Sequence, residues 1–573
     1  MKNLEVAEIL YKVANLLELK DEIIFKVLAY RKAAQNIEGF SQDIAEIYKN
    51  GGPKALQELP GIGKAIAGKI EEILNTGKLR YLEDLKKKIP IDVDALMNIE
   101  GLGPKRIGTL YKKLNVKNVN DLKRVAKAGK IRNLSRFGPK AEENILKAIE
   151  FSRAAKQRFV LGYVWPQILE LEKKLKDVGE IKRLEICGSA RRRKETIGDL
   201  DILAISNNSR KVMDYFTHLD LVKRISAKGN TKSTVVLKNN MQVDLRVLAK
   251  ESFGAAMQYF IGNKEHNIKL RRIAISKGYK LSEYGLFKGK KIIAADNEED
   301  VYKKLGLDYV EPEMREDQGE IELAMKHKLP KLVKLSDIKG DQHMHTKQSD
   351  GLNTMEEMIE KAISLGREYI VISDHTGFLQ IAGALNERQL LKQIEYVKKM
   401  NRRYGDEIKI FSGCEVDIKD NGQPGMKNLI LKQLDVVNAS IHSGFKESED
   451  KITKRTIAAM ENENVDIIGH PTGRILQKRE PFAISMEKVF EKAKETGTCL
   501  EINAFPTRLD LKDVYIRKAI NNKVKLVIST DAHHTSHQEF MQFGVWQARR
   551  GWAEAKDILN TLTIAKFLKG LKH

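Results

Sequence analysis

Two carboxylates in this chain have the spacing of neighbours on one face of a β-strand, and they follow a turn suited to phosphate. Asp199 and Asp201 are two residues apart, so on an extended strand both project from the same side. Shortly before them, Gly188 and Ser189 can offer backbone N–H groups and a hydroxyl to phosphate oxygens, and Arg192 adds a fixed positive charge. Paired carboxylates beside a phosphate cradle suit Mg²⁺, and two such ions assist phosphoryl transfer. The segment therefore predicts metal-dependent phosphoryl transfer.

A third carboxylate lies on a predicted hairpin. Residues 233–237 and 241–247 have the pattern of two strands joined by a turn, and Asp244 lies on the returning strand among apolar neighbours. Taken alone, Asp244 would be an ordinary polar residue on the solvent face of a strand. Together with the upstream pair, it is interpreted as the third member of a catalytic, metal-binding triad.

These residues resemble the nucleotidyltransferase palm, and more closely that of the family X DNA polymerases, the polymerase beta group. Residues 259–263 read Tyr-Phe-Ile-Gly-Asn and match the Tyr-Phe-x-Gly segment that lines the sugar of the incoming nucleotide in this family. The resemblance implies Mg²⁺ or Mn²⁺ at the triad and a deoxynucleoside triphosphate as substrate. It assigns nucleotide binding to Gly188, Ser189, Arg192, Tyr259, Phe260, Gly262, Asn267 and Arg271.

The composition favours a polyanionic partner. The chain of 573 residues carries a formal net charge of +23, which a charge-rich but merely soluble chain does not require. Three widely spaced cysteines indicate neither a disulfide framework nor a cysteine zinc site. Neither an apolar leader nor a long apolar span is evident, so we expect a cytoplasmic protein with no membrane partner.

Two Gly-x-Gly turns in the N-terminal third, residues 61–63 and 101–103, each precede a basic, helix-like segment. A single such turn is weak evidence, but two copies look like helix-hairpin-helix motifs, which hold the DNA backbone at helix N-termini without reading sequence. A K⁺ or Na⁺ ion is a further expectation at these motifs. The predicted DNA-binding residues are Gly61, Gly63, Lys64, Gly101, Gly103 and Lys105.

Lys69 lies in the helix after the first of these turns. In family X this hairpin holds the downstream 5′-phosphate of a gap, and Lys69 matches the Schiff-base lysine of members with deoxyribose-phosphate lyase activity. A lysine can act in this way only when it is partly deprotonated. The alternative, a solvated or phosphate-contacting lysine, stays open because Phe25 and Ala65 replace residues that would help to bind the 5′-phosphate.

From about residue 335, apolar strand-like runs alternate with helical stretches, which predicts parallel β/α units arranged as a barrel. Nine of the twelve histidines lie in this part, and imidazole and carboxylate ligands suit Zn, Mn or Fe. Histidine and acidic residues follow nearly every predicted strand. The candidate metal ligands are His343, His345, Asp350, His375, Glu415, His442, His470, Asp531 and His533.

This pattern resembles the PHP (polymerase and histidinol phosphatase) domain. The resemblance implies a distorted seven-stranded β/α barrel whose two or three metal ions, Mn²⁺ or Zn²⁺ or both, serve the hydrolysis of phosphoesters. All nine ligand positions of the family have a match here. Arg474, which follows one of them, is a candidate contact for substrate phosphate.

The fold class expected is therefore multidomain α/β. Six segments are predicted: an N-terminal helical domain over 1–88, fingers over 89–150, a palm over 151–260, a thumb over 261–318, a linker over 319–336 and a PHP domain over 337–573.

The order of these segments matches bacterial and archaeal family X DNA polymerases. It implies a monomeric, DNA-directed DNA polymerase that fills short gaps in base excision repair and acts on gapped or primer–template DNA. The PHP domain would add a 3′–5′ exonuclease, with abasic-site endonuclease or 3′-phosphatase activity as further options. Two alternatives stay open: a small-molecule phosphoesterase of the histidinol phosphatase type with a DNA-binding accessory half, and a repair scaffold without catalysis.

Overall fold

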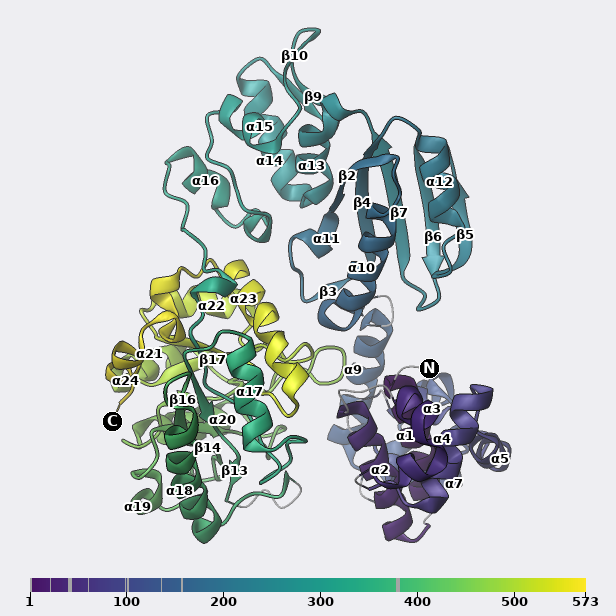
Figure 1. The fold of residues 1–573 in the computed structure, drawn as a ribbon, viewed down its shortest axis with the longest axis vertical. Coiled ribbons are helices and arrows are strands. Elements are labelled where there is room, and N and C mark those ends of the chain that lie inside the picture. The colour runs from purple at the N-terminus through teal and green to yellow at the C-terminus, as the bar shows by residue number, and fades with distance from the viewer. Residues whose placement is uncertain are drawn as a thin grey trace. The chain divides into compact units, whose positions relative to one another are not determined.

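The computed structural model describes residues 3–20, 22–39, 44–59, 61–97, 99, 102–135, 137–155, 158–377 and 382–572 (Figure 1). The chain divides into two compact units, residues 1–156 with 477–479, and residues 157–476 with 480–573. Each unit buries hydrophobic cores of its own. Gly101 lies outside the described residues.

The first unit is helical, as the spacing of its apolar residues predicts. Leu10, Val13 and Leu17 are completely or almost completely buried along the first helix and belong to one continuous core. The helices are α1 (Asn3–Leu19), α2 (Ile24–Gly39), α3 (Ile44–Gln57), α4 (Lys64–Thr76), α5 (Arg80–Lys88), α6 (Val93–Met97), α7 (Pro104–Leu114), α8 (Val119–Lys127), η1 (Ile131–Asn133) and α9 (Pro139–Ala155).

A five-stranded sheet opens the second unit. Its order is β2-β4-β7-β6-β5, with β4 and β7 parallel and the other neighbours antiparallel. The hairpin predicted over residues 233–247 is confirmed as β6 and β7. The strands are β2 (Ile181–Ile186), β4 (Asp199–Ser206), β5 (Val222–Lys228), β6 (Lys232–Leu237) and β7 (Gln242–Leu248).

The two faces of β4 pack against different helices. Leu200 and Ile202 belong to the core that includes α10 and α12, whereas Leu203 belongs to the core of α13. Because side chains alternate along a strand, Asp199 and Asp201 share the face of Leu203. The surrounding elements are β1 (Phe159–Val160), α10 (Leu161–Lys176), α11 (Gly188–Arg191), β3 (Thr196–Ile197), α12 (Ser209–Thr217), η2 (Lys250–Ser252) and α13 (Phe253–Ile261).

A three-stranded antiparallel sheet with helices follows, and a buried ion pair lies in its core. The Arg315 side chain is fully buried, pairs with Glu298 and donates a 2.8 Å hydrogen bond to the carbonyl oxygen of Val310. The elements are α14 (Lys264–Ser276), β8 (Lys280–Ser282), β9 (Gly285–Lys288), β10 (Lys291–Ala294), α15 (Glu298–Lys304), η3 (Pro312–Met314) and α16 (Glu320–Met325).

The C-terminal part forms a nearly closed barrel of parallel strands, as the alternation of strand-like and helical runs predicts. Its order is β11-β12-β14-β15-β16-β17-β18, with β13 also paired to β14. The backbone N–H of His345 donates a 2.8 Å hydrogen bond to Ala532 and so links the ends of β11 and β18. The strands are β11 (Gly340–Asp341), β12 (Tyr369–Ile372), β13 (His375–Thr376), β14 (Lys409–Asp417), β15 (Val436–Ser440), β16 (Ile467–Ile468), β17 (Cys499–Asn503) and β18 (Leu526–Ser529).

Helices lie around the barrel strands (Figure 1). They are η4 (Leu335–Asp337), α17 (Met355–Ser364), α18 (Glu387–Tyr404), α19 (Asn428–Leu431), α20 (Glu449–Glu461), α21 (Met486–Thr496), α22 (Asp513–Asn521), η6 (Thr535–Phe540), α23 (Met541–Arg550), η7 (Ala555–Asp557), η8 (Leu559–Thr561) and α24 (Ile564–Gly570).

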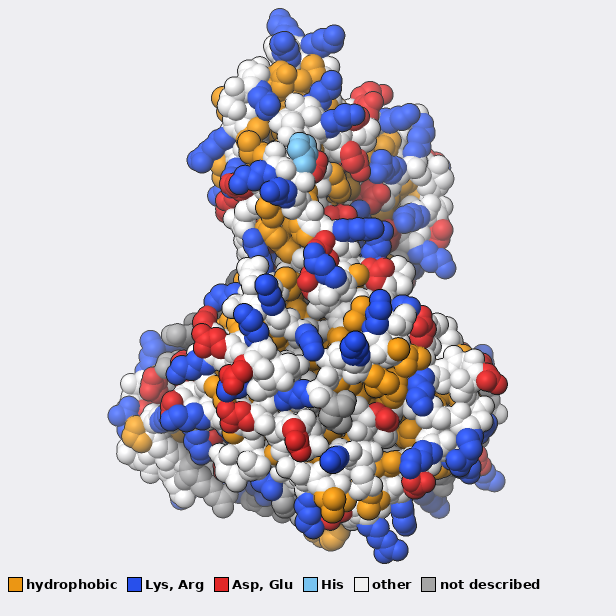
Figure 2. Space-filling model, turned by 90° about the vertical axis from the view of Figure 1, so that its left-hand side faces the viewer, with side chains coloured by type: hydrophobic (Ala, Val, Ile, Leu, Met, Phe, Trp, Pro, Cys, Tyr) orange, Lys and Arg blue, Asp and Glu red, His pale blue; other side chains and the backbone are white. Residues whose placement is uncertain are grey.

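The six predicted segment boundaries stay predictions. Helix α9 runs across the boundary predicted at residue 150, and the division between the two compact units follows it. None of the described helices combines the length and the apolar character that a membrane crossing requires. Figure 2 shows many Lys and Arg side chains among fewer Asp and Glu, which fits the net charge of +23.

Removing Arg315 should destabilise the chain strongly. Arg315→Met leaves Glu298 buried without its counter-charge, which costs about 3–5 kcal/mol of unfolding free energy. Chemical denaturation of the full chain measures the change, and Arg272→Met, an exposed arginine on α14, is the control. The double variant Arg315→Met/Glu298→Met should recover part of the loss. Equal stability of Arg315→Met and the control would contradict this account.

Candidate active sites

The register of two parallel strands brings the predicted carboxylate triad together. Asp201 on β4 is the Cα partner of Asp244 on β7, and Asp199 precedes Asp201 by two residues on the same face. Burial raises the pKa of Asp201 to about 6, and the charges of Asp199 and Asp244 contribute to this shift. Three neighbouring carboxylates are a site at which a divalent cation relieves repulsion.

Asp244 is held in place by the hairpin that carries it. Its cross-strand partner Thr234 donates a 2.7 Å hydrogen bond from Oγ1 to Oδ1 of Asp244. Lys232, earlier on β6, lies 2.8 Å from the other carboxylate oxygen. The hairpin therefore fixes the orientation of the carboxylate, and the Lys232 ammonium neutralises part of its charge.

Gly188 lies against the triad and has room for no side chain. Its φ is +61°, and a Cβ atom there would be 2.6 Å from Oδ2 of Asp201. The backbone N–H of Cys187 donates a 2.8 Å hydrogen bond to the Asp201 carbonyl oxygen. Ser189 is the next residue, half-buried in α11. The structure thus brings the predicted phosphate turn directly against the predicted metal ligands.

Arg192 lies between this turn and the predicted nucleotide segment. Its guanidinium donates to the carbonyl oxygen of Ile261, and its Nε lies 3.1 Å from Oε1 of Glu316. A Cβ on Gly262 would be 3.2 Å from Nη1 of Arg192. Arg192 is therefore placed beside Gly262 as expected, but its charge is paired with Glu316, which a triphosphate would have to share or displace.

The remaining nucleotide-binding candidates are held together by hydrogen bonds. Asn267 donates a 2.7 Å hydrogen bond from Nδ2 to the carbonyl oxygen of Tyr259, and Nε of Arg271 donates to the Asn267 carbonyl oxygen at 3.3 Å. The Tyr259 and Phe260 rings pack edge to face at 5.1 Å. Arg246, which the sequence interpretation missed, lies 4.7 Å above the Phe260 ring from its place two residues after Asp244. The Asp-x-Arg spacing on one strand face was the available signal.

Both predicted hairpins present helix N-termini of the same kind. α4 begins after Gly63 and α7 after Gly103, and no side chain of the described residues caps either helix. The first N–H groups of a helix without such a cap are suited to a phosphate oxygen. Lys64 and Lys105 are exposed in the first turns of these helices. Gly61 adopts φ +75°, which the turn before α4 requires.

Lys69 lines an open pocket of about 520 Å³ at the first hairpin. The ammonium lies 5.9 Å from the centre of the Tyr30 ring and 5.1 Å from that of Tyr81. Burial raises the pKa of Tyr30 to about 12, so its hydroxyl stays protonated. The pocket therefore surrounds a partly buried lysine with two aromatic rings.

In the barrel, candidate ligands lie at the carboxyl ends of successive strands, and Glu415 is at their centre. One of its oxygens lies 3.4 Å from Nε2 of His343 and 3.0 Å from Nδ1 of His375. The other lies 3.3 Å from Nε2 of His442 and 3.0 Å from Nε2 of His470. A carboxylate with imidazoles on both oxygens has the geometry of a ligand that bridges two cations.

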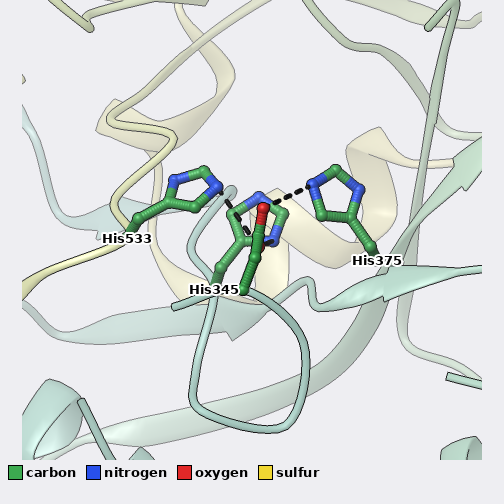
Figure 3. Close-up of side chains that lie close together, drawn as sticks. His345, His375 and His533 are labelled. Carbon is green, nitrogen blue, oxygen red and sulfur yellow. Dashed lines mark ion pairs between the residues drawn. The ribbon is translucent and has the colours of Figure 1, made fainter. Parts of the chain in front are cut away.

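A second group of ligands adjoins the first. Figure 3 shows His345 between His375 and His533, and the three rings stack at centroid distances of 4.4 and 4.2 Å. Asp350 lies 3.6 Å from Nε2 of His375 and 3.4 Å from Nε2 of His533. Nε2 of His345 is also 3.3 Å from Oδ1 of Asp531. All nine candidate ligands therefore gather at one end of the barrel.

The donor atoms fit metal ions. Nε2 of His343 and both ring nitrogens of His345 are buried and lack a hydrogen-bond partner within the described part of the chain. Burial lowers the pKa of His345 to about 3, with the neighbouring imidazoles adding to the shift. Burial also disfavours the charged form of His442, but Glu415 and Asp417 outweigh it and raise the pKa of His442 to about 9. Three subsets of these residues have ligand atoms within 4.8 Å of one another.

Supporting residues around this centre were missed in the sequence. Glu501 on β17 lies 2.8 Å from Nδ1 of His343, and Asp417 lies 2.6 Å from Nδ1 of His442, so each fixes the orientation of an imidazole. Nε of Arg508 lies 3.2 Å from Oδ2 of Asp531 and places a cation at the edge of the site. Glu501 and Asp417 lie in runs with a strand-like pattern, but no neighbouring residue in the sequence indicates which histidine each of them contacts. Arg474, expected at substrate phosphate, is instead buried and bound to Glu195.

Comparison with known proteins gives the same order of parts. Family models match residues 1–79 (helix-hairpin-helix domain), 93–150 (SAM-like helix-hairpin-helix tandem), 256–316 (DNA polymerase beta thumb) and 341–505 (PHP domain). A Bacillus subtilis protein, DNA polymerase/3′-5′ exonuclease PolX, is 36% identical over 568 residues, which is 98% of each chain. The chain belongs to the family X DNA polymerases that carry a PHP domain.

More distant relatives match separate parts of this family X chain. DNA polymerase lambda of Rattus norvegicus is 25% identical over 55% of this chain and 56% of its own. A probable phosphatase of Thermoanaerobacter sp. is 34% identical over 34% of this chain and 78% of its own. The predicted family and fold class are confirmed, and the family X and PHP parts are metal-dependent. The roles of individual residues stay predictions.

Metal binding by the barrel should depend on Glu415 and His345. Glu415→Gln and His345→Ala each remove donors that two groups of ligands share, so each variant should retain fewer ions than the wild type. Elemental analysis after chelation, loading with Mn²⁺ and removal of free ions measures the content. His327→Ala, an exposed histidine outside the barrel, is the control. Wild-type metal content in both barrel variants would refute the centre.

Proposed function

We propose that this chain is a DNA-directed DNA polymerase that fills short gaps during DNA repair, and that its barrel degrades DNA in the 3′–5′ direction. The observation that carries the proposal is the presence of two separate sets of candidate ligands, the triad on β4 and β7 and the nine barrel residues that include Glu415. The relative that is similar over 98% of each chain is named for both activities. We also propose that the chain acts as a monomer in the cytoplasm, on gapped or primer–template DNA and deoxynucleoside triphosphates.

In the polymerase site, each group has a role that follows from its position. Asp199 and Asp201 would hold both cations, and Asp244 would hold the one beside the primer 3′-hydroxyl. Such cations lower the pKa of the attacking oxygen and neutralise charge on the transferring phosphoryl group. Gly188 and Ser189 would bind the triphosphate through N–H groups and a hydroxyl, and Arg192 would add charge. The Tyr259–Gly262 backbone would contact the sugar, with Asn267 fixing Tyr259.

In the barrel, the chain's residues would hold a DNA phosphodiester among cations. Glu415 would be among the residues that hold them, while Glu501 and Asp417 would keep His343 and His442 in orientation. Mn²⁺ or Zn²⁺ would lower the pKa of water and neutralise the departing oxygen. We propose Mg²⁺ or Mn²⁺ for the palm. Abasic-site cleavage and 3′-phosphate removal are further proposals for the same centre, as is a K⁺ or Na⁺ ion at the hairpins.

The phosphatase relative supports a second candidate for the barrel, hydrolysis of small phosphate esters. The polymerase beta thumb and the paired hairpins favour DNA instead, because a small-molecule phosphatase needs neither. Comparison of turnover on free phosphate monoesters and on single-stranded DNA separates the two. A repair scaffold without catalysis is opposed by the intact triad.

Asp244→Asn should abolish gap filling and spare the nuclease. The amide keeps the shape of the side chain but loses the charge, and the loss of charge stabilisation should lower incorporation about 100-fold or more. Single-nucleotide incorporation into a one-nucleotide gap measures this, with 3′–5′ degradation followed in parallel. Asp220→Asn, an exposed carboxylate on the same domain, is the control. Normal primer extension by Asp244→Asn would exclude Asp244 from the triad.

The first hairpin should create a preference for a gap with a 5′-phosphate. Gly63→Val places its side chain in open space and shields the first N–H groups of α4, so this preference should fall while activity on an open primer–template persists. Gly68→Ala, also in open space on α4, is the matched control. Wild-type affinity should fall steeply with salt, because the contacts are to phosphates. An unchanged preference in Gly63→Val would remove the hairpin from 5′-phosphate binding.

The pocket at Lys69 supports a lyase activity as an additional proposal. An incised abasic substrate should form a Schiff base with Lys69 that borohydride converts to a stable adduct. Lys69→Ala should lose the adduct, whereas Lys64→Ala, exposed on the same helix, should retain it. Equal trapping in both variants would show that another amine is the main nucleophile.

A further inference from the structure

Side chains outside the palm hold the turn between the phosphate-binding helix and the strand of the triad. This turn, residues 192–195, joins α11 to β3, and Asp199 follows shortly after it. Each of its four residues contacts α23, the loop after β16, or Glu316 at the end of the thumb.

Glu195 makes the most specific of these contacts. Its two carboxylate oxygens lie 3.2 Å from Nη1 and 2.5 Å from Nη2 of Arg474, so the guanidinium binds it through both nitrogens. Nε2 of Gln547 on α23 donates a further 2.7 Å hydrogen bond to the same carboxylate. The Glu195 carbonyl oxygen accepts a 2.9 Å hydrogen bond from the N–H of Leu161. Both the side chain and the backbone of Glu195 are therefore fixed.

Arg193 and Arg192 are held in other ways. The Arg193 guanidinium lies against two indole rings that pack edge to face with each other, 4.5 Å from Trp165 of α10 and 4.1 Å from Trp546 of α23. Its backbone has φ +55°, a left-handed conformation. The Arg192 carbonyl oxygen accepts a 2.9 Å hydrogen bond from Nη1 of Arg550, whose Nη2 lies 2.5 Å from Asp513.

Arg474 is close in sequence to a candidate ligand of the barrel, and Glu195 is close in sequence to a carboxylate of the palm triad. Arg474 is the fourth residue after His470, and Glu195 is the fourth before Asp199. The segment between His470 and Arg474 is itself pinned, because Asp510 accepts 2.9 Å hydrogen bonds from the N–H and the hydroxyl of Thr472. Arg474 is only 5% exposed, so it is not available to a substrate. It is placed to act on the palm.

We infer that Arg474 is a positioning residue for the polymerase reaction: through Glu195 it holds the turn that presents Ser189 and Arg192 to the incoming triphosphate. The inference rests on the proposed polymerase function and extends it, since it assigns part of nucleotide binding to a side chain of the PHP domain. Loss of the contact should let the turn move and weaken triphosphate binding. The triad on β4 and β7 is held by strand pairing and should keep its chemistry.

The test compares Arg474→Met, Glu195→Gln and the double variant in the full chain. Each single variant should raise the KM for the nucleotide in gap filling about tenfold, with little change in kcat. The double variant should match the single ones, because all three lose the same contact. Arg474→Lys should restore part of the affinity, since it keeps the charge but not the paired geometry. Arg402→Met, exposed on α18, is the control.

Degradation of single-stranded DNA is followed on the same preparations and should stay at the wild-type rate. The unfolding temperature should fall in the single variants, because each leaves one partner of a buried ion pair without its counter-charge, so both activities are assayed well below it. An unchanged KM in Arg474→Met would overturn the inference. So would a parallel loss of both activities, which would make the contact merely structural. A wild type that neither incorporates nor binds nucleotide would instead refute the proposed polymerase.

Discussion

Buried carboxylates carry charge that must be compensated, and the two ligand sets of this chain do this in different ways. In the palm, burial and then the neighbouring charges of Asp199 and Asp244 raise the pKa of Asp201 to about 6. In the barrel, Glu415 is buried but has imidazoles on both oxygens. The palm thus leaves the repulsion for cations to neutralise, whereas the barrel spreads charge over histidines. In each domain, the surrounding strands keep the candidate metal ligands in position.

The scaffolds do this with backbone pairing rather than with flexible contacts. β4 and β7 lie in the middle of their sheet, so Asp201 and Asp244 cannot separate unless central hydrogen bonds break. In the barrel, the candidate ligands lie at the ends of strands that are hydrogen-bonded to one another in a fixed order. Rigid support of this kind is what a metal centre requires, because small displacements of ligands weaken both binding and catalysis.

Patterns within short segments allowed much of this to be predicted. The two-residue period placed Asp199 and Asp201 on one face, and the hairpin pattern placed Asp244 on its partner strand. Histidine and acidic residues after predicted strands indicated the nine barrel ligands, all of which match the PHP domain, and the structure gathers them in one place. The contact between Glu195 and Arg474 could not be predicted, because 279 residues separate the two and neither lies in a pattern that names the other. Glu501 and Asp417 were missed for the same reason, since a supporting carboxylate is recognised only by the histidine that it contacts in space.

Polymerisation and 3′–5′ degradation act in opposite directions on one DNA end, so a chain that carries both ligand sets must keep their chemistry separate while placing them in one molecule. Separate metal centres satisfy the first requirement. For the second, a buried and doubly hydrogen-bonded ion pair is a suitable connection, because removing either partner leaves the other charge without compensation. Such a pair resists rearrangement more than a surface ion pair does. The turn before Asp199 is thereby held by Arg474 and Gln547 of the PHP domain, because its own strand pairing is limited to the two residues of β3.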